Sequence, residues 1–232
     1  VMRSVIEEKT NRIIEIIVSS VKPLQLMLGK ILGTSLAGIT HFTIWVVLGT
    51  LLMFVAAAFT GVDMVPPPSG AQEGLEAMAN NEMQQLLTDI YNLPRFTLII
   101  SFLVYFIGGY FLYSAIYAAI GAAVDSETDT QQFMFPIILP LMLGIYVGFF
   151  SVIENPHGTV STIFSMIPLT SPIVMLMRIP FGVPWWELAI SVSLLILTNA
   201  LVLWLAAKIY RVGILMYGKK PTYKELYKWL KY

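Results

Sequence analysis

Apolar positions along this chain form four long uninterrupted runs. The runs contain no Asp, Glu, Lys or Arg and cover Ile31–Thr60, Phe96–Val124, Phe133–Ile153 and Leu188–Ala207. A helix of about 20 apolar residues crosses the hydrocarbon of a bilayer, so each run is long enough to do so. Because hydrocarbon offers no partner to backbone N–H and C=O groups, spans of this kind must be helices. The pattern therefore predicts an all-α, polytopic membrane protein with four transmembrane helices.

The first thirty residues show a different pattern, in which apolar residues recur at helical spacing among charged ones. From Met2 to Ser19 the apolar residues are Val5, Ile6, Ile13, Ile16 and Ile17, and the charged ones include Glu7, Glu8, Lys9, Arg12 and Glu15. This pattern indicates an amphipathic helix at the membrane surface. We expect it to break at Ser19, Ser20 and Pro23, with a short piece from Leu24 to Lys30 leading into the first span. The pattern alone leaves open whether the helix only lies on lipid or also docks a partner.

Between the spans, glycine, proline and tyrosine mark particular positions. The loop 61–95 holds Pro66–Pro68 and then a stretch, Ala71–Tyr91, with apolar residues near helical spacing, which predicts a helix on the outer surface. The second span contains Gly108 and Gly109, followed by a polar series of Tyr110, Tyr113, Ser114 and Tyr117. Close helix packing is the favoured interpretation of this series. A polar lining along a substrate path is the alternative.

The third span holds Pro136 and Pro140, so we expect it to be bent or broken in its first half, and Gly144 and Gly148 are spaced for close packing. The next stretch, 158–177, is apolar but contains Pro168 and Pro172, and Arg178 ends it. It is therefore predicted to form a re-entrant or outer-surface hairpin within an external region, 154–184. Trp185 and Trp186 then mark the outer interface, where indole rings prefer to lie.

Positive charge gathers at both ends of the chain, although the formal net charge is zero. Seven Lys and Arg residues follow the last span, and only Arg95 and Arg178 lie between residue 31 and residue 207. The positive-inside rule then places residues 1–30, the loop 125–132 and the tail 208–232 in the cytoplasm of a plasma (inner) membrane protein. Residues 31–60, 96–124, 133–153 and 185–207 would cross the membrane. With 57% hydrophobic and 12% charged residues, the chain is unlike a soluble domain, and no nucleic-acid partner is expected.

Two motifs suggest enzymatic chemistry and are not supported by their surroundings. Gly213–Lys220 fits the first positions of a phosphate-binding loop, but Lys220 stands where a hydroxyl should hold magnesium, and a membrane helix precedes it. Glu7 and Glu8 with Arg12 resemble the signature of CAAX-processing membrane proteases, which also need histidines. His41 has Ala37 four residues before it, and His157 falls in the outer loop, so the required geometry is missing.

Catalytic, metal and cofactor sites are therefore not expected in this chain. It has no cysteine and so no thiolate ligand. No acidic residue lies in the middle of a span, which argues against an autonomous ion-driven pump.

Four segments of the chain resemble the ABC-2 type transporter permeases, particularly the branch with the sodium-exporter permease NatB. The segments are Val5–Lys30, with Glu-Glu-Lys, Ser before Pro and Gly-Lys ahead of a span; Gly121–Glu127 with Gln131 and Gln132; Ile167–Arg178; and Ala207–Arg211 with Gly213. The resemblance implies that this chain is the C-terminal portion of such a permease.

The resemblance also implies roles for particular residues. Two permease subunits of that family pair with two cytoplasmic ATPases, whose closure is passed to the membrane through the segment before a span. ATPase coupling would fall on Glu7, Glu8, Lys9, Arg12, Glu15, Ser20, Pro23, Gly29 and Lys30. An external gate would be formed by Pro168, Ser171, Pro172 and Arg178.

The leading hypothesis is therefore a transmembrane permease subunit of an ATP-driven exporter, which hydrolyses nothing itself. Its partners would be a cytoplasmic ABC ATPase, a second permease subunit and the lipid bilayer. An intramembrane CAAX-type protease and a noncatalytic membrane scaffold are the alternatives.

Overall fold

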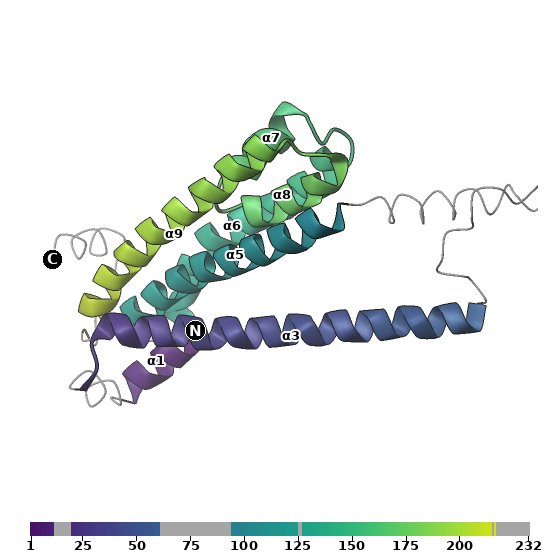
Figure 1. Cartoon of the computed structure of the whole chain (residues 1–232). Coiled ribbons are helices and arrows are strands. Elements are labelled where there is room, and N and C mark those ends of the chain that lie inside the picture. The colour runs from purple at the N-terminus through teal and green to yellow at the C-terminus, as the bar shows by residue number, and fades with distance from the viewer. Residues whose placement is uncertain (12–19, 61–93, 125–126, 215, 217–232) are drawn as a thin grey trace, which may run out of the picture.

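A computed structural model describes residues 1–11, 20–60, 94–124, 127–214 and 216, and the regular structure within these ranges is helical throughout (Figure 1). The long helices are α3 (Pro23–Thr60), α5 (Arg95–Ala123), α6 (Glu127–Val147) and α9 (Trp185–Gly213). The shorter elements are α1 (Met2–Thr10), the π-helical turn η1 (Gly148–Val152), α7 (Thr159–Met166), α8 (Ser171–Arg178) and the 3₁₀ turn η2 (Ile179–Phe181). Within the described residues, four helices are long and apolar enough to cross a membrane, which confirms the predicted fold class.

The first and last spans extend beyond their apolar runs. The first span is continuous with the piece before it, because α3 begins at Pro23, where the missing N–H of proline costs nothing. The last helix begins at Trp185 and ends at Gly213, so it takes in Glu187 at one end and Arg211 at the other. Residues 61–93, with their predicted helix, and most of the tail beyond residue 213 lie outside the described residues.

α6 departs most from the prediction. We expected residues 125–132 to form a cytoplasmic loop, but the helix is already regular from Glu127. Pro136 and Pro140, where we expected a bend or a break, do not interrupt the helix, because α6 continues through both. Membrane helices tolerate proline where neighbouring groups satisfy the freed backbone atoms. The irregularity appears instead at the other end of the helix, in the π-helical turn.

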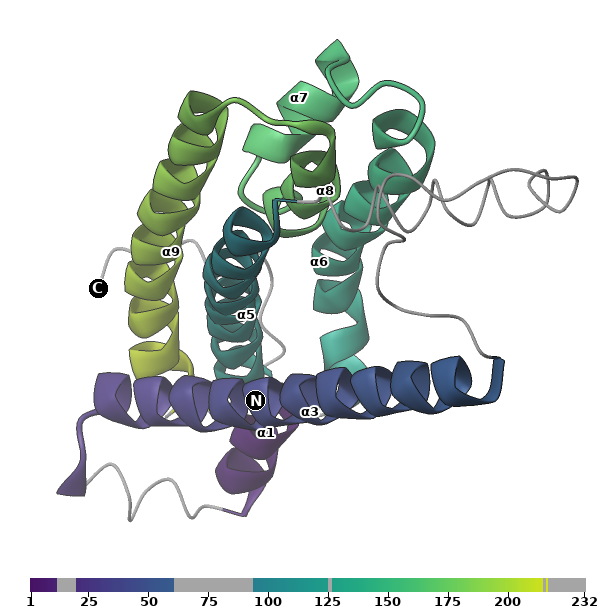
Figure 2. The same cartoon turned by 45° about the vertical axis from the view of Figure 1, so that its right-hand side comes forward.

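α5 is the central helix of the fold. Figure 2 shows it between α9 and α6, and it also packs against α1, α3 and α8. Near one end, buried alanines of α5 allow close approach of Val5 from α1, Met27 from α3 and Tyr210 from α9. Near the other, Tyr105 and Leu112 pack against Met175 of α8 and Leu195 of α9. The chain is therefore organised around one rod with a core cluster toward each end.

The adjacent glycines in α5 serve two different helix contacts. A Cβ at Gly108 would lie 2.7 Å from a side-chain carbon of Leu195 in α9. A Cβ at Gly109 would lie 3.1 Å from Pro172 of α8. Gly144 and Gly148 of the third span face Thr170 and Met177, so they seat the hairpin helix α8 against the span. The close-packing interpretation of these glycines is confirmed.

α3 packs on its neighbours along only part of its length. Its first half buries Met27 and Ile31, and Phe42 stacks on Phe102 of α5 with ring centroids 4.4 Å apart. Figure 1 shows the far half of the helix diverging from α5. Its far half carries large exposed apolar side chains, among them Trp45, Phe54 and Phe59.

Candidate functional site

Two clusters at opposite ends of the helices hold most of the residues to which the sequence analysis gave roles. α1, the start of α3 and the end of α9 lie together at one end, and α7 and α8 lie at the other (Figure 1). We call the first cluster the α1 junction and the second, after its predicted position, the outer hairpin. The α1 junction contains the predicted coupling residues that the structure describes, and the outer hairpin contains the predicted gate residues.

The α1 junction is centred on Lys9, whose side chain is buried. Its ammonium Nζ donates hydrogen bonds to the carbonyl oxygen of Ala122 at 2.8 Å and to that of Val124 at 3.3 Å. These carbonyls belong to the C-terminal end of α5, where the last turn has no intrahelical donors left and the helix dipole is negative. Lys9 therefore caps α5 from a helix more than a hundred residues earlier in the chain.

Two glycines bring the backbones at this junction into contact. A Cβ at Gly121 would lie 2.9 Å from the carbonyl oxygen of Met2, so α1 rests directly on α5. A Cβ at Gly213 would lie 2.8 Å from the carbonyl oxygen of Ala122, so the end of α9 rests on the same turn. The described parts of three segments that carried the resemblance thus meet at the end of α5, where Lys9 binds Ala122 and Gly213 rests on the same residue.

α1 turns its remaining polar residues in two directions. Glu8 pairs with Lys30 of α3, with 2.6 Å between Oε2 and Nζ, and Lys30 also donates to Ser4 Oγ at 3.2 Å. Glu7 instead pairs with Arg3 on the exposed face, at 2.9 Å. Of the other predicted coupling residues, Ser20 and Gly29 are exposed and Pro23 begins α3, whereas Arg12 and Glu15 lie outside the described residues.

The outer hairpin consists of α7 and α8, joined by a turn at residues 167–170. Arg178, in the last turn of α8, is fully buried and satisfied by several partners. Its Nη2 lies 2.9 Å from Oε2 of Glu187 in the first turn of α9. Its Nε donates to the carbonyl oxygen of Pro156 at 2.7 Å, and its Nη1 to Ser165 Oγ at 2.6 Å. A buried guanidinium needs such partners, since a lone buried charge is very costly.

Further hydrogen bonds tie the hairpin to its neighbours. Ser191 of α9 donates to the carbonyl oxygen of Ser165 at 2.7 Å, and Tyr113 of α5 donates to that of Leu169 at 2.6 Å. Among the other predicted gate residues, Pro168 lies in the turn, Ser171 is buried at the start of α8, and Pro172 packs on Gly109. The hairpin is thus held by α5 on one side and α9 on the other.

Sequence reasoning missed Glu187 as the partner of Arg178. The sequence contains a signal for this pair, since no Asp, Glu, Lys or Arg lies between Arg178 and Glu187. A buried cation at a helix end requires an anion nearby, and Glu187 is the acid that follows it in the chain. That rule would have found the pair.

An aromatic groove of about 650 Å³ joins the two clusters. Its walls come from four helices: Val1–Arg3 at α1, Met134 and Leu141 of α6, Pro172, Ile173 and Leu176 of α8, and a long stripe of α5. The α5 stripe contains six aromatic rings, at Phe102, Tyr105, Phe106, Tyr110, Tyr113 and Tyr117. This places the tyrosines of the second span along a groove, which favours the alternative that we gave for them, although Gly108 and Gly109 beside them serve packing.

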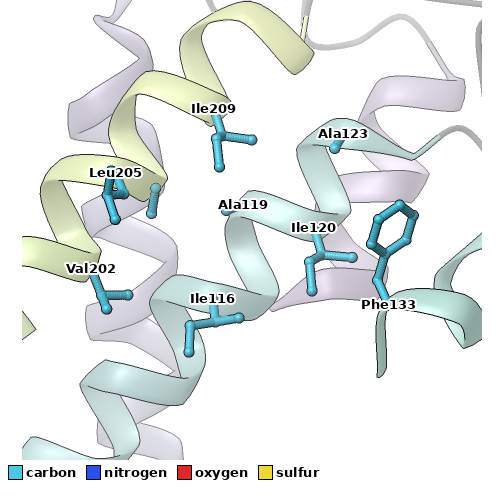
Figure 3. Close-up of a pocket in the computed structure, with 9 residues that line it drawn as sticks. Ile116, Ala119, Ile120, Ala123, Phe133, Val202, Leu205 and Ile209 are labelled. Atoms are coloured by element: carbon cyan, nitrogen blue, oxygen red, sulfur yellow. The ribbon is translucent and has the colours of Figure 1, made fainter. Parts of the chain in front are cut away.

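A second, smaller pocket of about 210 Å³ lies between α5, α9 and α6 (Figure 3). Figure 3 shows Ile116 and Ile120 of α5 facing Val202 and Ile209 of α9, with Phe133 at one side. All of its lining side chains are hydrocarbon, so it offers no hydrogen-bonding group to orient a polar ligand.

The two histidines considered for the protease hypothesis, His41 and His157, are both exposed. Nδ1 of His41 lies 2.8 Å from the carbonyl oxygen of Ala37, one turn earlier in α3. Within the described residues, no three His, Asp or Glu side chains come together as a metal site would require.

Comparisons with known proteins agree over most of the chain. Residues 1–208 match the family model described as "ABC-2 family transporter protein". The chain is 28% identical over 220 residues to the uncharacterised protein YhaP of Bacillus subtilis (strain 168), which covers 94% of this chain and 48% of that protein. It is 25% identical over 229 residues to the uncharacterised protein MJ1024 of Methanocaldococcus jannaschii, covering 98% of this chain and 48% of that protein. No solved structure matches the chain.

Proposed function

Because the chain belongs to the ABC-2 transporter family, we propose that it forms the translocation path of an ATP-driven exporter and couples to a separate cytoplasmic ATPase. Membership of the family makes it a multi-pass membrane transport permease, which is a noncatalytic component. The chain spans about half the length of the curated relatives it matches. The proposal includes export, the ATPase partner and a second permease subunit. It also includes a place in the NatB-like branch and the assignment of this chain to the C-terminal portion of the permease.

The observation that supports coupling best is the division of α1 into two faces. Val5, Ile6 and Lys9 are buried against the other helices, whereas Arg3, Glu7 and Thr10 are exposed. A helix that is fixed on one side and polar on the other is suited to receive a soluble partner. The exposed face, with Glu7 at its centre, would contact the ATPase.

Force from the ATPase would then reach the membrane helices through the buried face. Lys9 binds the end of α5, Glu8 binds Lys30 near the start of α3, and Gly213 seats α9 on α5. Sequence reasoning expected α1 to act on α3, the span that it precedes. The contacts instead favour α5 as the main receiver, because α1 rests on its backbone and caps its end.

The outer hairpin would act as the external gate of the same pathway. In α5, Tyr113 binds Leu169 in the turn of the hairpin and Gly109 packs against Pro172 of α8. A displacement of α5 at the junction would therefore also move the hairpin. In this proposal the junction faces the cytoplasm of a plasma membrane, as the basic ends of the chain require. The hairpin then lies at the outer face.

Copurification with the ATPase tests the proposal directly. In the full-length permease, Glu7→Lys should reduce copurification of a soluble ATPase, because it reverses charge on the exposed face of α1. Glu154→Lys is the matched control, since the same exchange is then made at an exposed acid near the outer hairpin. If no ATPase copurifies with the unaltered protein, or if both variants bind it equally, the coupling proposal is wrong.

A further inference from the structure

The aromatic groove between α1, α5, α6 and α8 touches both functional clusters. It is lined at one end by residues of α1 and along its wall by Pro172 and Leu176 of the outer hairpin. Any displacement of α1 relative to α8 therefore changes its shape. A volume of about 650 Å³ is in the range of sites for organic ligands.

The chemistry of the wall excludes a bare inorganic ion as a good ligand. Among the lining residues that the structure describes, none is Asp or Glu, and Arg3 is the charged residue present. The other polar side chains of the wall carry neutral hydroxyls, and that of Tyr113 already donates to the carbonyl oxygen of Leu169. A small ion such as Na⁺ would lose its water without gaining a cage of charged oxygens, which is strongly unfavourable in a medium of low polarity.

For a large organic cation, the cost of losing hydration is smaller and the attraction to aromatic rings can exceed it. Its charge is spread over many atoms, so little hydration is lost when it enters the groove. The faces of Phe and Tyr rings carry negative potential and attract such cations when water is excluded. Six rings line one side of this groove, and the guanidinium at its rim is paired with Glu7 at 2.9 Å.

We propose that this groove binds amphipathic organic cations, and that these are the substrate class of the exporter. The inference rests on the proposed export function. Tyr117 is the ring most open to test, because it is only half-buried and no hydrogen bond holds it among those described for this part of α5.

The test uses two probes of the same shape and opposite charge, tetraphenylphosphonium and tetraphenylborate. Binding of each is measured to the full-length permease with its ATPase in lipid nanodiscs, with empty nanodiscs subtracted. We expect saturable binding of tetraphenylphosphonium and none of tetraphenylborate. Tyr117→Leu should weaken tetraphenylphosphonium binding about tenfold, whereas Tyr117→Phe, which keeps the ring, should change it less than about threefold.

Tyr146→Leu is the matched control, because Tyr146 is an exposed tyrosine of α6 that lies outside the groove. Met134→Trp offers a second variant, which fills the groove from α6 and should also block binding. If tetraphenylborate binds as well as tetraphenylphosphonium, or if neither groove variant weakens binding, the inference is wrong. Because copurification of the ATPase is scored in the same preparations, failure of the groove and failure of the export proposal give different results.

Discussion

The ammonium of Lys9 lies 2.8 Å from the carbonyl oxygen of Ala122, and this bond joins the first helix of the chain to the end of its central helix. The carbonyl oxygen of Val124 lies 3.3 Å from the same nitrogen. A buried cation at the negative end of a helix is stabilised both by hydrogen bonds and by the dipole. Any movement of α1 must therefore carry the end of α5 with it, or else break these bonds.

Removing this cap should uncouple the permease while leaving ATPase binding intact. Lys9→Met keeps the length of the side chain but deprives the carbonyls of Ala122 and Val124 of their donor, at a cost of about 1–3 kcal/mol in stability. We expect transport per ATP hydrolysed to fall by about threefold to thirtyfold in reconstituted vesicles. The exposed face of α1 is unchanged, so the ATPase should still copurify. Lys22→Met, at an exposed lysine, is the control.

The tight seat of α9 on α5 should be sensitive to a single methyl group. Gly213→Ala places a carbon 2.8 Å from a backbone oxygen, which a side-chain rotation cannot relieve. We expect the free energy of unfolding to fall by about 1–3 kcal/mol, measured in mixed micelles. Gly33→Ala in α3, where nothing lies within 4 Å, should be neutral or stabilising by up to about 1 kcal/mol. Equal effects at the two sites would contradict the packing described for the junction.

In the buried ion pair of the outer hairpin, replacing one partner alone should destabilise the fold more than the pair's joint replacement would suggest. Arg178→Met alone leaves the carboxylate of Glu187 buried without its cation, so we expect a loss of about 3–5 kcal/mol in the free energy of unfolding. The double variant Arg178→Met, Glu187→Met should lose less than the sum of the two single variants. Strict additivity in the double-mutant cycle would show that the two side chains do not interact.

Membrane orientation can be tested with single cysteines in a cysteine-free background, to which residues 1–232 contribute none. Lys22→Cys lies near the α1 junction and Glu154→Cys near the outer hairpin, and both positions are exposed. In intact cells an impermeant maleimide should label position 154 and not position 22. Labelling of both positions from the same side would contradict the proposed topology.

Much of the helical framework follows from the sequence because hydrocarbon leaves a long apolar run few alternatives. α5 lies within one residue of the predicted span at each end. α6 differs from the expectation, because Pro136 and Pro140, which are local signals for a bend or a break, do not interrupt it. In a packed membrane protein those signals are overridden by neighbouring groups that satisfy the backbone.

The sequence predicted which residues belong to the candidate site but not which of them contact one another. The resemblance assigned Glu8, Lys9 and Lys30 together to ATPase coupling, and it did not distinguish a buried face of the helix from an exposed one. Which side of α1 each residue occupies depends on contacts with residues more than a hundred positions away, such as Ala122. The pairing of Arg178 with Glu187 was missed for a similar reason, because the apolar run was taken to begin at Leu188, just after the acid that completes it.

The length of α3 sets a requirement on the surrounding lipid. Its 38 residues make a rod of about 57 Å, nearly twice the roughly 30 Å thickness of a hydrocarbon core. Such a rod must lean steeply or extend well past the headgroups. A thinner or thicker bilayer would change its inclination, and with it the stacking of Phe42 on Phe102. Activity should therefore depend on acyl-chain length, with an optimum where that aromatic contact is preserved.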